Sequence, residues 1–372
     1  MRQLLHIALA FFWCNSIVNA QNLSMVFDIN PFGSESSSNP SNFFIFNDKL
    51  YFSAKDARLI DEYWEYDGIG DPVIVKDFIP QLDNMLPLYL TEFNNKLYFY
   101  TYTEIDTSRW SRLYYDVKIW EYDGSNYPHL LKSYSGSQHK FPSELVVFNN
   151  KLYFNAFDTA NGEELWVYDG SDDPKLVKDI YPGFSYYEEG DYEKRKKYAN
   201  GSRPHHLTAF KNCLYFCGYH SDNRLRLWVY DGINDPVLIK DNTGNPVLYP
   251  SELMVFNNTL YFCAHDTIHG SELWGYDGIN NPALEIDIYP GFRIEEEGKH
   301  IANNSSPSNF TVFNNKLHFT ANDGIHGKEL MVYDGINDPV LVNDIRQGIN
   351  SSSPSEAGCW PSRYPARRPF PR

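Results

Sequence analysis

Residues Asn149 to Gly183 read "NNKLYFNAFDTANGEELWVYDGSDDPKLVKDIYPG", and residues Asn257 to Gly291 repeat them as "NNTLYFCAHDTIHGSELWGYDGINNPALEIDIYPG". Aligning the chain on the Tyr-Asp-Gly triplet finds six copies, and the shortest spacing between them is 46 residues. The aspartates of these triplets are Asp67, Asp123, Asp169, Asp231, Asp277 and Asp334. A period of this length is typical of propellers and solenoids.

Each copy contains four short runs rich in aromatic and β-branched residues, separated by turn-forming residues. Asn149-Asn150 favours a tight hairpin turn between the first two runs, because asparagine tolerates a positive φ. Asp169-Gly170 ends the third run, and Pro174 precedes the fourth, where a missing amide donor is harmless. In the third copy the runs are 145–148, 151–156, 164–168 and 175–180. The pattern predicts four antiparallel strands per copy.

The third run, "ELWVYDG", indicates how these small sheets are packed. In an extended strand Leu165 and Val167 point to one face, whereas Trp166 and Tyr168 point to the other. Both faces are therefore apolar, as expected for a sheet that lies between two neighbours. We predict an all-β fold, a β-propeller of four-stranded antiparallel blades.

The ends of the repeat region suggest how the ring is completed. "MVFDINPFGSESSSNPS" at 25–41 resembles "LVNDIRQGINSSSPS" at 341–355, so the region begins with an isolated fourth strand. Residues 356–372 do not continue the repeat, which we interpret as a truncation or frame-shift of a ring of seven or more blades. The predicted organisation is a signal peptide at 1–20, a propeller domain at 21–355 and an atypical tail at 356–372. Its repeats span about 40–80, 87–133, 142–183, 204–242, 250–291 and 307–346.

The best-formed copies are "GEELWVYDG" at 162–170, "GSELWGYDG" at 270–278 and "GKELMVYDG" at 327–335. Together with the following Leu-Val-Lys-Asp-Ile-x-Pro-Gly pattern, they resemble the ELWxxDGT repeat family of secreted proteins, over nearly all of 22–355. The resemblance implies a repetitive β architecture and an extracellular location, and it implies no reaction. Serine or isoleucine replaces the threonine after Asp-Gly, and the second and fourth copies lack the Gly-x-Glu stretch.

The N-terminus predicts export from the cell. An apolar run from Leu4 to Trp13 precedes the small residues Val18-Asn19-Ala20, which suit cleavage before Gln21. This run is too short to span a bilayer, and no later window approaches the required length. Asn-x-Ser/Thr sequons are consistent with secretion and glycosylation. They lie at Asn22, Asn200, Asn257, Asn303, Asn304, Asn309 and Asn350.

Four cysteines follow the predicted cleavage point, too few for a disulfide-held scaffold. They are Cys213, Cys217, Cys263 and Cys359. Cys217 and Cys263 occupy the same place in neighbouring copies. Two interpretations remain open, a disulfide between copies and a pair of buried thiols in strands.

The charge of the chain limits its partners. The formal charge is −16, and it becomes about −21 without Arg2 and the four arginines of the tail. Nucleic acid is excluded as a partner, because its phosphates would be repelled. Cations, basic or mineral surfaces, glycans and other matrix components are the expected partners.

Paired carboxylates before each "ELW" motif form one candidate site. Within each pair the aspartate precedes the glutamate by six residues; the pairs are Asp158 and Glu164, Asp266 and Glu272, and Asp323 and Glu329. Such oxygens suit calcium, the only cofactor the sequence suggests, although the dense ligand pattern of a calcium loop is missing. The alternative is that each aspartate caps a hairpin while each glutamate stays solvated.

Two long loops between copies, 181–204 and 289–307, are acidic and end near sequons. Loops on a rigid ring often bind partners, and the alternative is a solvated, glycosylated insertion. No sequence motif predicts a catalytic residue, because the HExxH, GxSxG, phosphate-binding and sialidase-box patterns are all missing.

These observations predict a secreted, non-enzymatic propeller that acts as an acidic component of an extracellular matrix. The charge suggests association with calcium or mineral, as in the organic matrix of a shell. Two alternatives stay open: a lectin-like or receptor-binding propeller, and an enzyme on a propeller scaffold.

Overall fold

The computed structural model describes residues 27–29, 37–58, 60–75, 87–105, 114–125, 127–137, 144–188, 195–294, 298–352 and 354. The predicted signal peptide, Asn22, Cys359 and the predicted tail lie outside these residues. The described part consists of antiparallel strands without an α-helix, which confirms the all-β prediction. No helix in this part is long and apolar enough to cross a membrane.

The strands form six four-stranded units, which we call sheets one to six. Sheet one contains β1 (Ser41–Phe46), β2 (Lys49–Lys55), β3 (Asp61–Tyr66) and β4 (Val73–Ile74). Sheet two contains β5 (Leu88–Phe93), β6 (Lys96–Ile105), β7 (Tyr114–Tyr122) and β8 (His129–Ser137). Sheet three contains β9 (Val146–Phe148), β10 (Lys151–Asp158), β11 (Gly162–Tyr168) and β12 (Lys175–Lys178).

Sheet four contains β15 (His205–Phe210), β16 (Cys213–Tyr219), β17 (Leu225–Tyr230) and β18 (Val237–Leu238). Sheet five contains β19 (Leu248–Phe256), β20 (Thr259–Asp266), β21 (Gly270–Tyr276) and β22 (Ala283–Ile286). Sheet six contains β25 (Ser308–Phe313), β26 (Lys316–Asn322), β27 (Lys328–Tyr333) and β28 (Val340–Asn343). One bridge between Arg226 and Leu248 joins sheets four and five.

The turns within the sheets follow from the sequence. Asn149 and Asn150 have φ values of 47° and 54°, and the flanking residues Phe148 and Lys151 face each other. Left-handed backbone at both turn positions matches the twist of the two strands, so the hairpin is tight. The same two-residue turn joins the first two strands in every sheet, which confirms the prediction made for the third copy.

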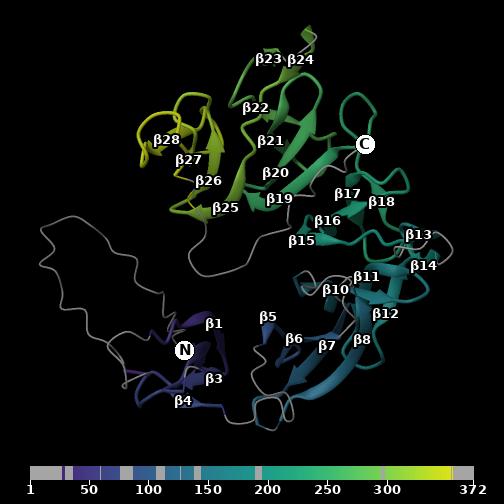
Figure 1. Ribbon diagram of the computed structural model, residues 1–372, viewed down its shortest axis with the longest axis vertical. Helices are drawn as coiled ribbons and strands as arrows, with labels where there is room; N and C mark the ends of the chain where they lie inside the picture. The colour runs from purple at the N-terminus through teal and green to yellow at the C-terminus, as the bar shows by residue number, and fades with distance from the viewer. Residues whose placement is uncertain are drawn as a thin grey trace, which may run out of the picture.

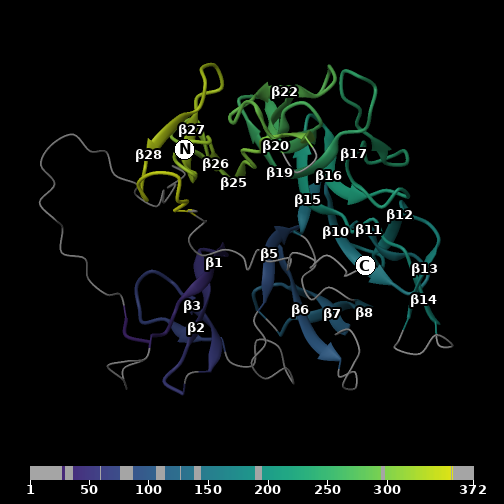
Figure 2. The ribbon, with the colours of Figure 1, turned by 45° about the horizontal axis from the view of Figure 1, so that its top comes forward.

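The six sheets follow one another around an arc (Figures 1 and 2). The first strands of successive sheets lie next to each other, so they line the inside of the arc, and the fourth strands lie outside. This is a propeller-like arrangement in its coarse features. No sheet closes on itself, and among the described residues no strand of sheet one pairs with a strand of sheet six.

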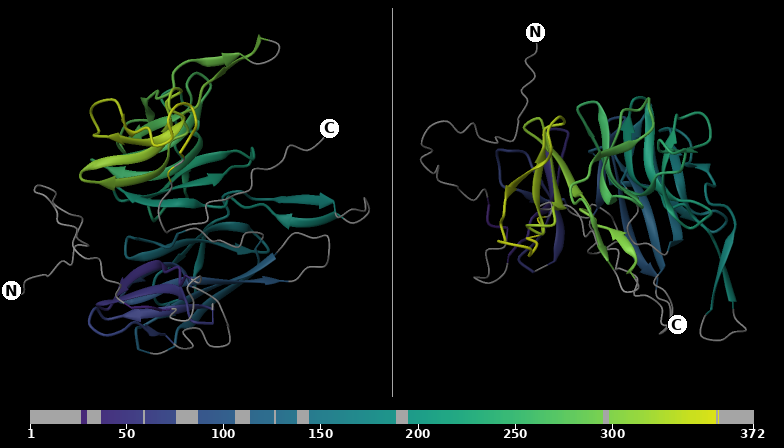
Figure 3. Two further views of the ribbon diagram at one scale, coloured as in Figure 1. Left: turned by 60° about the vertical axis from the view of Figure 1, so that its left-hand side comes forward. Right: turned by 90° about the horizontal axis from the view of Figure 1, so that it is seen from above.

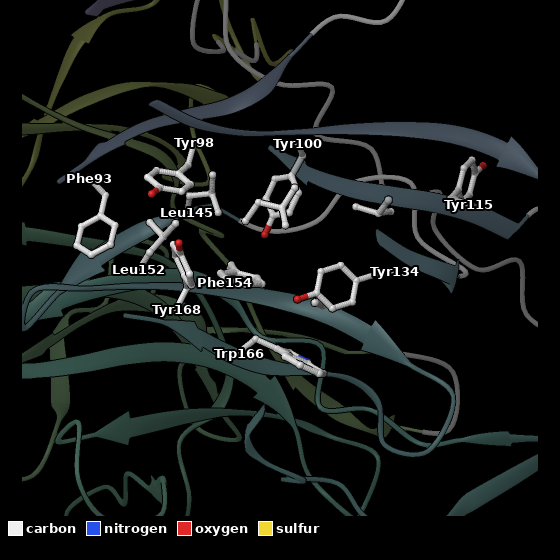
Figure 4. Close-up of a cluster of buried hydrophobic side chains, with 13 residues drawn as sticks. Phe93, Tyr98, Tyr100, Tyr115, Tyr134, Leu145, Leu152, Phe154, Trp166 and Tyr168 are labelled. Carbon is white, nitrogen blue, oxygen red and sulfur yellow. The ribbon is translucent and has the colours of Figure 1, made fainter. Parts of the chain in front are cut away.

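Hydrophobic clusters lie between neighbouring sheets. Trp166 and Tyr168 pack toward sheet two, whereas Leu165 packs toward sheet four. Figure 4 shows the first of these clusters, in which Tyr134 and Trp166 lie close together with ring centroids 5.4 Å apart. Both faces of the third sheet are therefore buried, as the alternation in "ELWVYDG" predicts.

The two long loops predicted between copies contain regular structure of their own. β13 (Phe184–Glu188) pairs with β14 (Arg195–Ala199), and β23 (Phe292–Ile294) pairs with β24 (His300–Ala302). These two-stranded hairpins project from the arc (Figure 3). Each of the long segments predicted to connect copies therefore contains a hairpin.

Candidate functional site

The first strands begin with an unusual backbone feature on the inside of the arc. In five sheets the register shifts within the first part of this strand, and a residue at the shift has a left-handed backbone although it is not glycine. It is the second residue of the strand in four sheets and the fifth residue in sheet five. These residues, with their φ values, are Asn42 (54°), Tyr89 (56°), His206 (54°), Glu252 (61°) and Asn309 (58°). Glu144 holds the same position in the third copy. Such conformations are costly for these residues and concentrate at functional sites.

Polar groups from sheets three to six meet here and form what we call the inner cluster. It consists of Glu144, His205, His206, Cys217, Glu252, Cys263 and Lys328. The charges of Glu144 and Glu252 both act on Cys217, and the charge of Lys328 acts on Glu252. Residues far apart in the chain are thus electrostatic neighbours.

Glu252 is the best-connected carboxylate of the inner cluster. Its Oε2 accepts a hydrogen bond from the backbone N–H of Asn309 at 3.0 Å, which links sheets five and six. Burial raises the pKa of Glu252, and the charge of Glu144 raises it further, while Lys328 acts in the opposite direction. A carboxyl group with a raised pKa can donate a proton near neutral pH.

Lys328 is held beside Glu252 by its own hydrogen bond. Its Nζ donates to the backbone carbonyl of Ser306 at 3.0 Å. Burial lowers the pKa of the Lys328 ammonium. Its positive charge is therefore less well solvated than that of a surface lysine, which strengthens its effect on a bound anion or a developing negative charge.

Glu144 is one of four described carboxylates with a buried oxygen that no described group donates to; the others are Asp179, Asp287 and Asp344. The buried oxygen of Glu144 is Oε2, and no described residue donates a hydrogen bond to it. Leaving a buried carboxylate oxygen without a donor costs more than an average hydrogen bond contributes. An oxygen in this state is available to a hydroxyl or N–H group of a bound molecule.

The two histidines lie side by side at the start of β15. The centroids of their rings are 5.1 Å apart, and Nδ1 of His205 is 2.9 Å from the carbonyl oxygen of Arg203. Burial lowers the pKa of His205 to about 4 and that of His206 to about 4. Both rings are therefore neutral at pH 7 and can each donate one hydrogen bond and accept another.

Cys217 and Cys263 lie in the second strands of sheets four and five as free thiols. Burial raises the pKa of Cys217 well above its usual range and raises the pKa of Cys263 to about 12. Both groups stay protonated, so neither is an activated nucleophile. In this structure both cysteines are buried free thiols, and a disulfide between copies stays a prediction.

In each predicted calcium pair, the aspartate and the glutamate make different contacts. Asp158 accepts hydrogen bonds from the backbone N–H groups of Ala160 at 2.7 Å and Asn161 at 2.8 Å, so it caps the hairpin. Asp266 and Asp323 do the same in sheets five and six. No group of three or more His, Cys, Asp or Glu side chains in the described segments is arranged to hold a metal. Calcium binding stays a prediction.

The glutamates of these pairs are buried, so the expectation that they are solvated was wrong. Glu164 accepts hydrogen bonds from the backbone N–H groups of Ser202 at 2.9 Å and Tyr181 at 3.1 Å, and from the Ser202 hydroxyl. Glu272 binds Ser305, and Glu329 binds Ser352, in the same way. We call this contact the glutamate latch, because it ties the third strand to the segment that leads to the next sheet.

Several sequon side chains are engaged in hydrogen bonds. The side-chain Nδ2 of each asparagine donates to one acceptor. Four of them donate to a backbone carbonyl: Asn200 to that of Pro182, Asn257 to that of Asp334, Asn303 to that of Pro290 and Asn304 to that of Ala302. Asn309 donates to the hydroxyl of Thr320. Asn350 is exposed. A glycan attached at Nδ2 would replace one of its two hydrogens, so Asn350 is the least constrained sequon within the described segments. Glycosylation stays a prediction.

The inner cluster does not follow from any of the sequence motifs, although the sequence contains one signal for it. Within repeats that otherwise match closely, the residue after "LYF" or its equivalent changes from copy to copy. It is Ser53, Tyr100, Asn155, Cys217, Cys263 and Thr320, and all six are buried. Such variation at a buried position of a repeat indicates a local role that differs from blade to blade.

Comparisons with known proteins give structural similarities only. No family model and no curated protein matches the chain, so the ELWxxDGT resemblance stays a prediction. An acylaminoacyl peptidase from Pyrococcus horikoshii matches with a TM-score of 0.44 and 11% identity, over 82% of this chain and 45% of the peptidase. The β-propeller domain of the Trilobed protease from Pyrococcus furiosus matches with a TM-score of 0.29 and 12% identity, over 84% of this chain and 98% of that domain.

A sialidase from Trypanosoma rangeli matches with a TM-score of 0.32 and 13% identity, over 81% of this chain and 54% of the sialidase. The chain thus spans less than half of the peptidase and about half of the sialidase. These proteins are hydrolases, so the comparisons go against the predicted non-enzymatic matrix component, and we withdraw that function. The likeness itself concerns the fold.

Proposed function

We propose that the chain is a hydrolase on a propeller scaffold, with the inner cluster as its active site and a glycoside as its substrate. The observation that carries this proposal is the buried Oε2 of Glu144, which no described residue satisfies, beside a second carboxyl group of raised pKa. Glycoside hydrolysis uses two carboxyl groups, one that donates a proton to the leaving oxygen and one that acts as nucleophile or base.

The roles follow from the surroundings of each group. Glu252, whose pKa is raised by burial and by its neighbour Glu144, acts as the proton donor to the leaving oxygen. Glu144 acts as the carboxylate that attacks the sugar carbon or activates water. His205 and His206, neutral at pH 7, supply hydrogen bonds to substrate hydroxyl groups.

The test uses the secreted full-length chain with a panel of aryl glycosides and polysaccharides, and it measures the release of phenol or of reducing ends. We expect E144Q and E252Q each to lower kcat by at least about 100-fold. E92Q is the matched control, because Glu92 is exposed on β5 and should leave turnover unchanged. Thermal melting of each variant separates loss of catalysis from loss of the fold.

Two results would change the proposal. Sugar binding without turnover would favour the lectin-like alternative at the same site. Turnover that survives both substitutions would remove the inner cluster from the mechanism.

Secretion and an extracellular location remain part of this proposal, supported by residues 1–20 and by the sequons. The ring of seven or more blades also remains a proposal. Ile29 supports it, because this residue packs against Phe52 and Trp64 of sheet one as the tail of a preceding blade would. The sequence of the transcript beyond the codon for Ser355 tests the blade number.

A further inference from the structure

The hairpins β13–β14 and β23–β24 leave the arc through the same backbone arrangement. Each follows a Tyr-Pro-Gly sequence whose glycine has a positive φ, 107° for Gly183 and 99° for Gly291, which a residue with a side chain rarely adopts. The backbone N–H of Asn200 donates to the carbonyl of Gly183 at 3.0 Å. That of Asn303 donates to the carbonyl of Gly291 at 3.0 Å. The two hairpins are therefore held at their bases in the same way.

One face of the first hairpin presents aromatic surface beside a positive charge. Phe184 and Tyr186 are two positions apart on β13, so their side chains lie on the same face, and they are 45% and 62% exposed. Tyr186 is paired with Lys197, whose Nζ lies 3.5 Å from the centroid of the Phe184 ring. The ammonium group covers part of this ring and holds it in place, and the rest of the ring is open to solvent.

The second hairpin has the same arrangement with different side chains. Phe292 and Ile294 occupy the equivalent positions of β23 and are 55% and 65% exposed. Ile294 is paired with His300, whose ring stacks on that of Phe292 with centroids 4.2 Å apart. In both hairpins a residue of the second strand thus fixes the first aromatic ring, and the apolar residue two positions later is exposed. Isolated exposed apolar side chains are ordinary, but a matched pair of such faces is not.

Both hairpins stand close to the inner cluster. Each lies in the connection from the fourth strand of one sheet to the first strand of the next, and both project toward the right in the left view of Figure 3. The chain runs from Ala199 at the end of β14 to His205 in six residues, so at most about 20 Å separates them. From Ala302 at the end of β24 it reaches Ser306, which accepts the hydrogen bond of Lys328, in four residues. A ligand made of several linked units can therefore contact a hairpin and the inner cluster together.

We propose that these faces of β13–β14 and β23–β24 form a binding surface for a polysaccharide. This inference rests on the proposed function for the nature of its ligand. Partly exposed rings offer flat apolar surface to the C–H faces of sugar rings, and Lys197 and His300 can donate hydrogen bonds to the hydroxyl groups. Each face is only two apolar side chains long, which suits a chain ligand that makes several weak contacts at once better than a compact ligand that needs one pocket.

The binding surface defines the class of substrate for the inner cluster. Chemistry at the inner cluster involves only the sugars on either side of the cleaved bond. Contacts on the hairpins add binding energy only when the ligand is long enough to reach them. We therefore expect the substrate to be a polymer, in preference to a short glycoside.

Affinity electrophoresis of the secreted full-length chain, in gels that contain xylan, arabinan, a β-glucan or hyaluronan, tests the binding directly. We expect at least one of these polysaccharides to retard the wild-type chain. The double variant Y186A/I294A removes one exposed side chain from each hairpin and keeps both stacked phenylalanines, and it should bind at least about tenfold more weakly. Y127A is the matched control, because Tyr127 is 65% exposed in the turn between β7 and β8, at the other end of the sheets. Thermal melting confirms that each variant is folded.

Turnover separates this inference from the proposed function. The ratio of kcat/KM for the retarding polysaccharide to kcat/KM for an aryl glycoside should fall at least about tenfold in Y186A/I294A and stay unchanged in Y127A. Retardation of the wild type without any turnover would support the binding surface and count against the proposed active site. Equal retardation of the wild type and Y186A/I294A, or none by any of the four polysaccharides, would overturn the binding surface whatever the turnover.

Discussion

Sheet three and sheet six have similar sequences in equivalent strands, but of these two only sheet three has a described sheet against each of its faces. Leu165 in sheet three is fully buried, whereas Leu330 at the same position in sheet six is half-buried. Strand pairing within the two sheets is alike, with seven registered residue pairs between β10 and β11 and six between β26 and β27. The difference shows that burial in this fold comes from contact between sheets rather than from the sheets themselves.

The glutamate latch shows the same difference in its electrostatics. Burial raises the pKa of Glu164 in sheet three to about 7, despite the hydrogen bonds from Ser202. For Glu329 in sheet six, burial also acts to raise the pKa, but the hydrogen bonds from Ser352 outweigh it and the net pKa is lowered. The same set of donors therefore has opposite net effects, depending on how much protein surrounds the carboxylate.

The largest expected effect is on stability when the two leucines are truncated. L165A should lower the free energy of unfolding by about 4 kcal/mol, because it leaves a cavity between two sheets. L330A should cost about half as much, since the side chain is already partly in water. Urea denaturation of both variants measures the two costs.

V147A is the control for this pair, because Val147 is exposed in sheet three and its truncation should change stability by less than about 0.5 kcal/mol. Equal costs for L165A and L330A would contradict the view that sheet contacts dominate. If the loss of unfolding free energy in L330A grows with protein concentration, the comparison becomes sharper. That result would indicate that Leu330 is buried when copies of the chain associate.

The next effect concerns pH. Folding raises the pKa of Glu164 from its ordinary 4.5 to about 7, so the folded state favours the protonated form. The contribution of Glu164 to stability is therefore fully present below pH 4.5 and is lost as the pH rises to about 7, by on the order of 3 kcal/mol. Glu329 has the opposite sign, because its pKa is lowered: its contribution is present above its ordinary pKa and is lost as the pH falls.

Unfolding free energies between pH 2 and pH 8 separate these two contributions, because the Glu329 contribution changes below pH 4.5 and the Glu164 contribution changes above it. E164Q should flatten the decline toward neutral pH, whereas E329Q should remove a decline on the acid side. Identical pH profiles for the two variants would show that the surroundings of the two latches do not differ in solution.

Much of the fold could be predicted because it depends on local patterns. Asn149-Asn150 predicts a tight turn from two residues, and the alternation in Leu165 to Tyr168 predicts two buried faces from four. Because the pattern recurs in six copies, a wrongly predicted strand in one copy has little effect on the predicted fold. The different burial of Leu165 and Leu330 could not be predicted, because it depends on what each sheet touches rather than on its own residues.

The inner cluster could not be predicted for a different reason. Glu144, His205 and Glu252 come from three different sheets, and they are electrostatic neighbours because the first strands of successive sheets lie next to each other. No spacing in the sequence expresses that convergence. The glutamate latch could not be predicted for a similar reason, because the spacing between its two residues varies. The serine follows the glutamate by 38 residues for Glu164 and by 23 residues for Glu329.

The smallest effect tests the latch itself by removing one hydroxyl. S202A takes one donor from Glu164 but keeps the backbone N–H groups of Ser202 and Tyr181, so we expect a loss of about 1 to 2 kcal/mol at pH 8. S352A should cost less than about 1 kcal/mol, because water can reach the more open end of sheet six and replace the hydroxyl. Both values come from urea denaturation, with S171A as the control, since Ser171 is exposed in a turn.

At pH 5 the carboxyl group of Glu164 is largely protonated, and the cost of S202A should shrink there, whereas the cost of S352A should not. If both costs fall equally on acidification, the two latches share one environment, and the contrast between an enclosed sheet and an end sheet does not extend to their electrostatics.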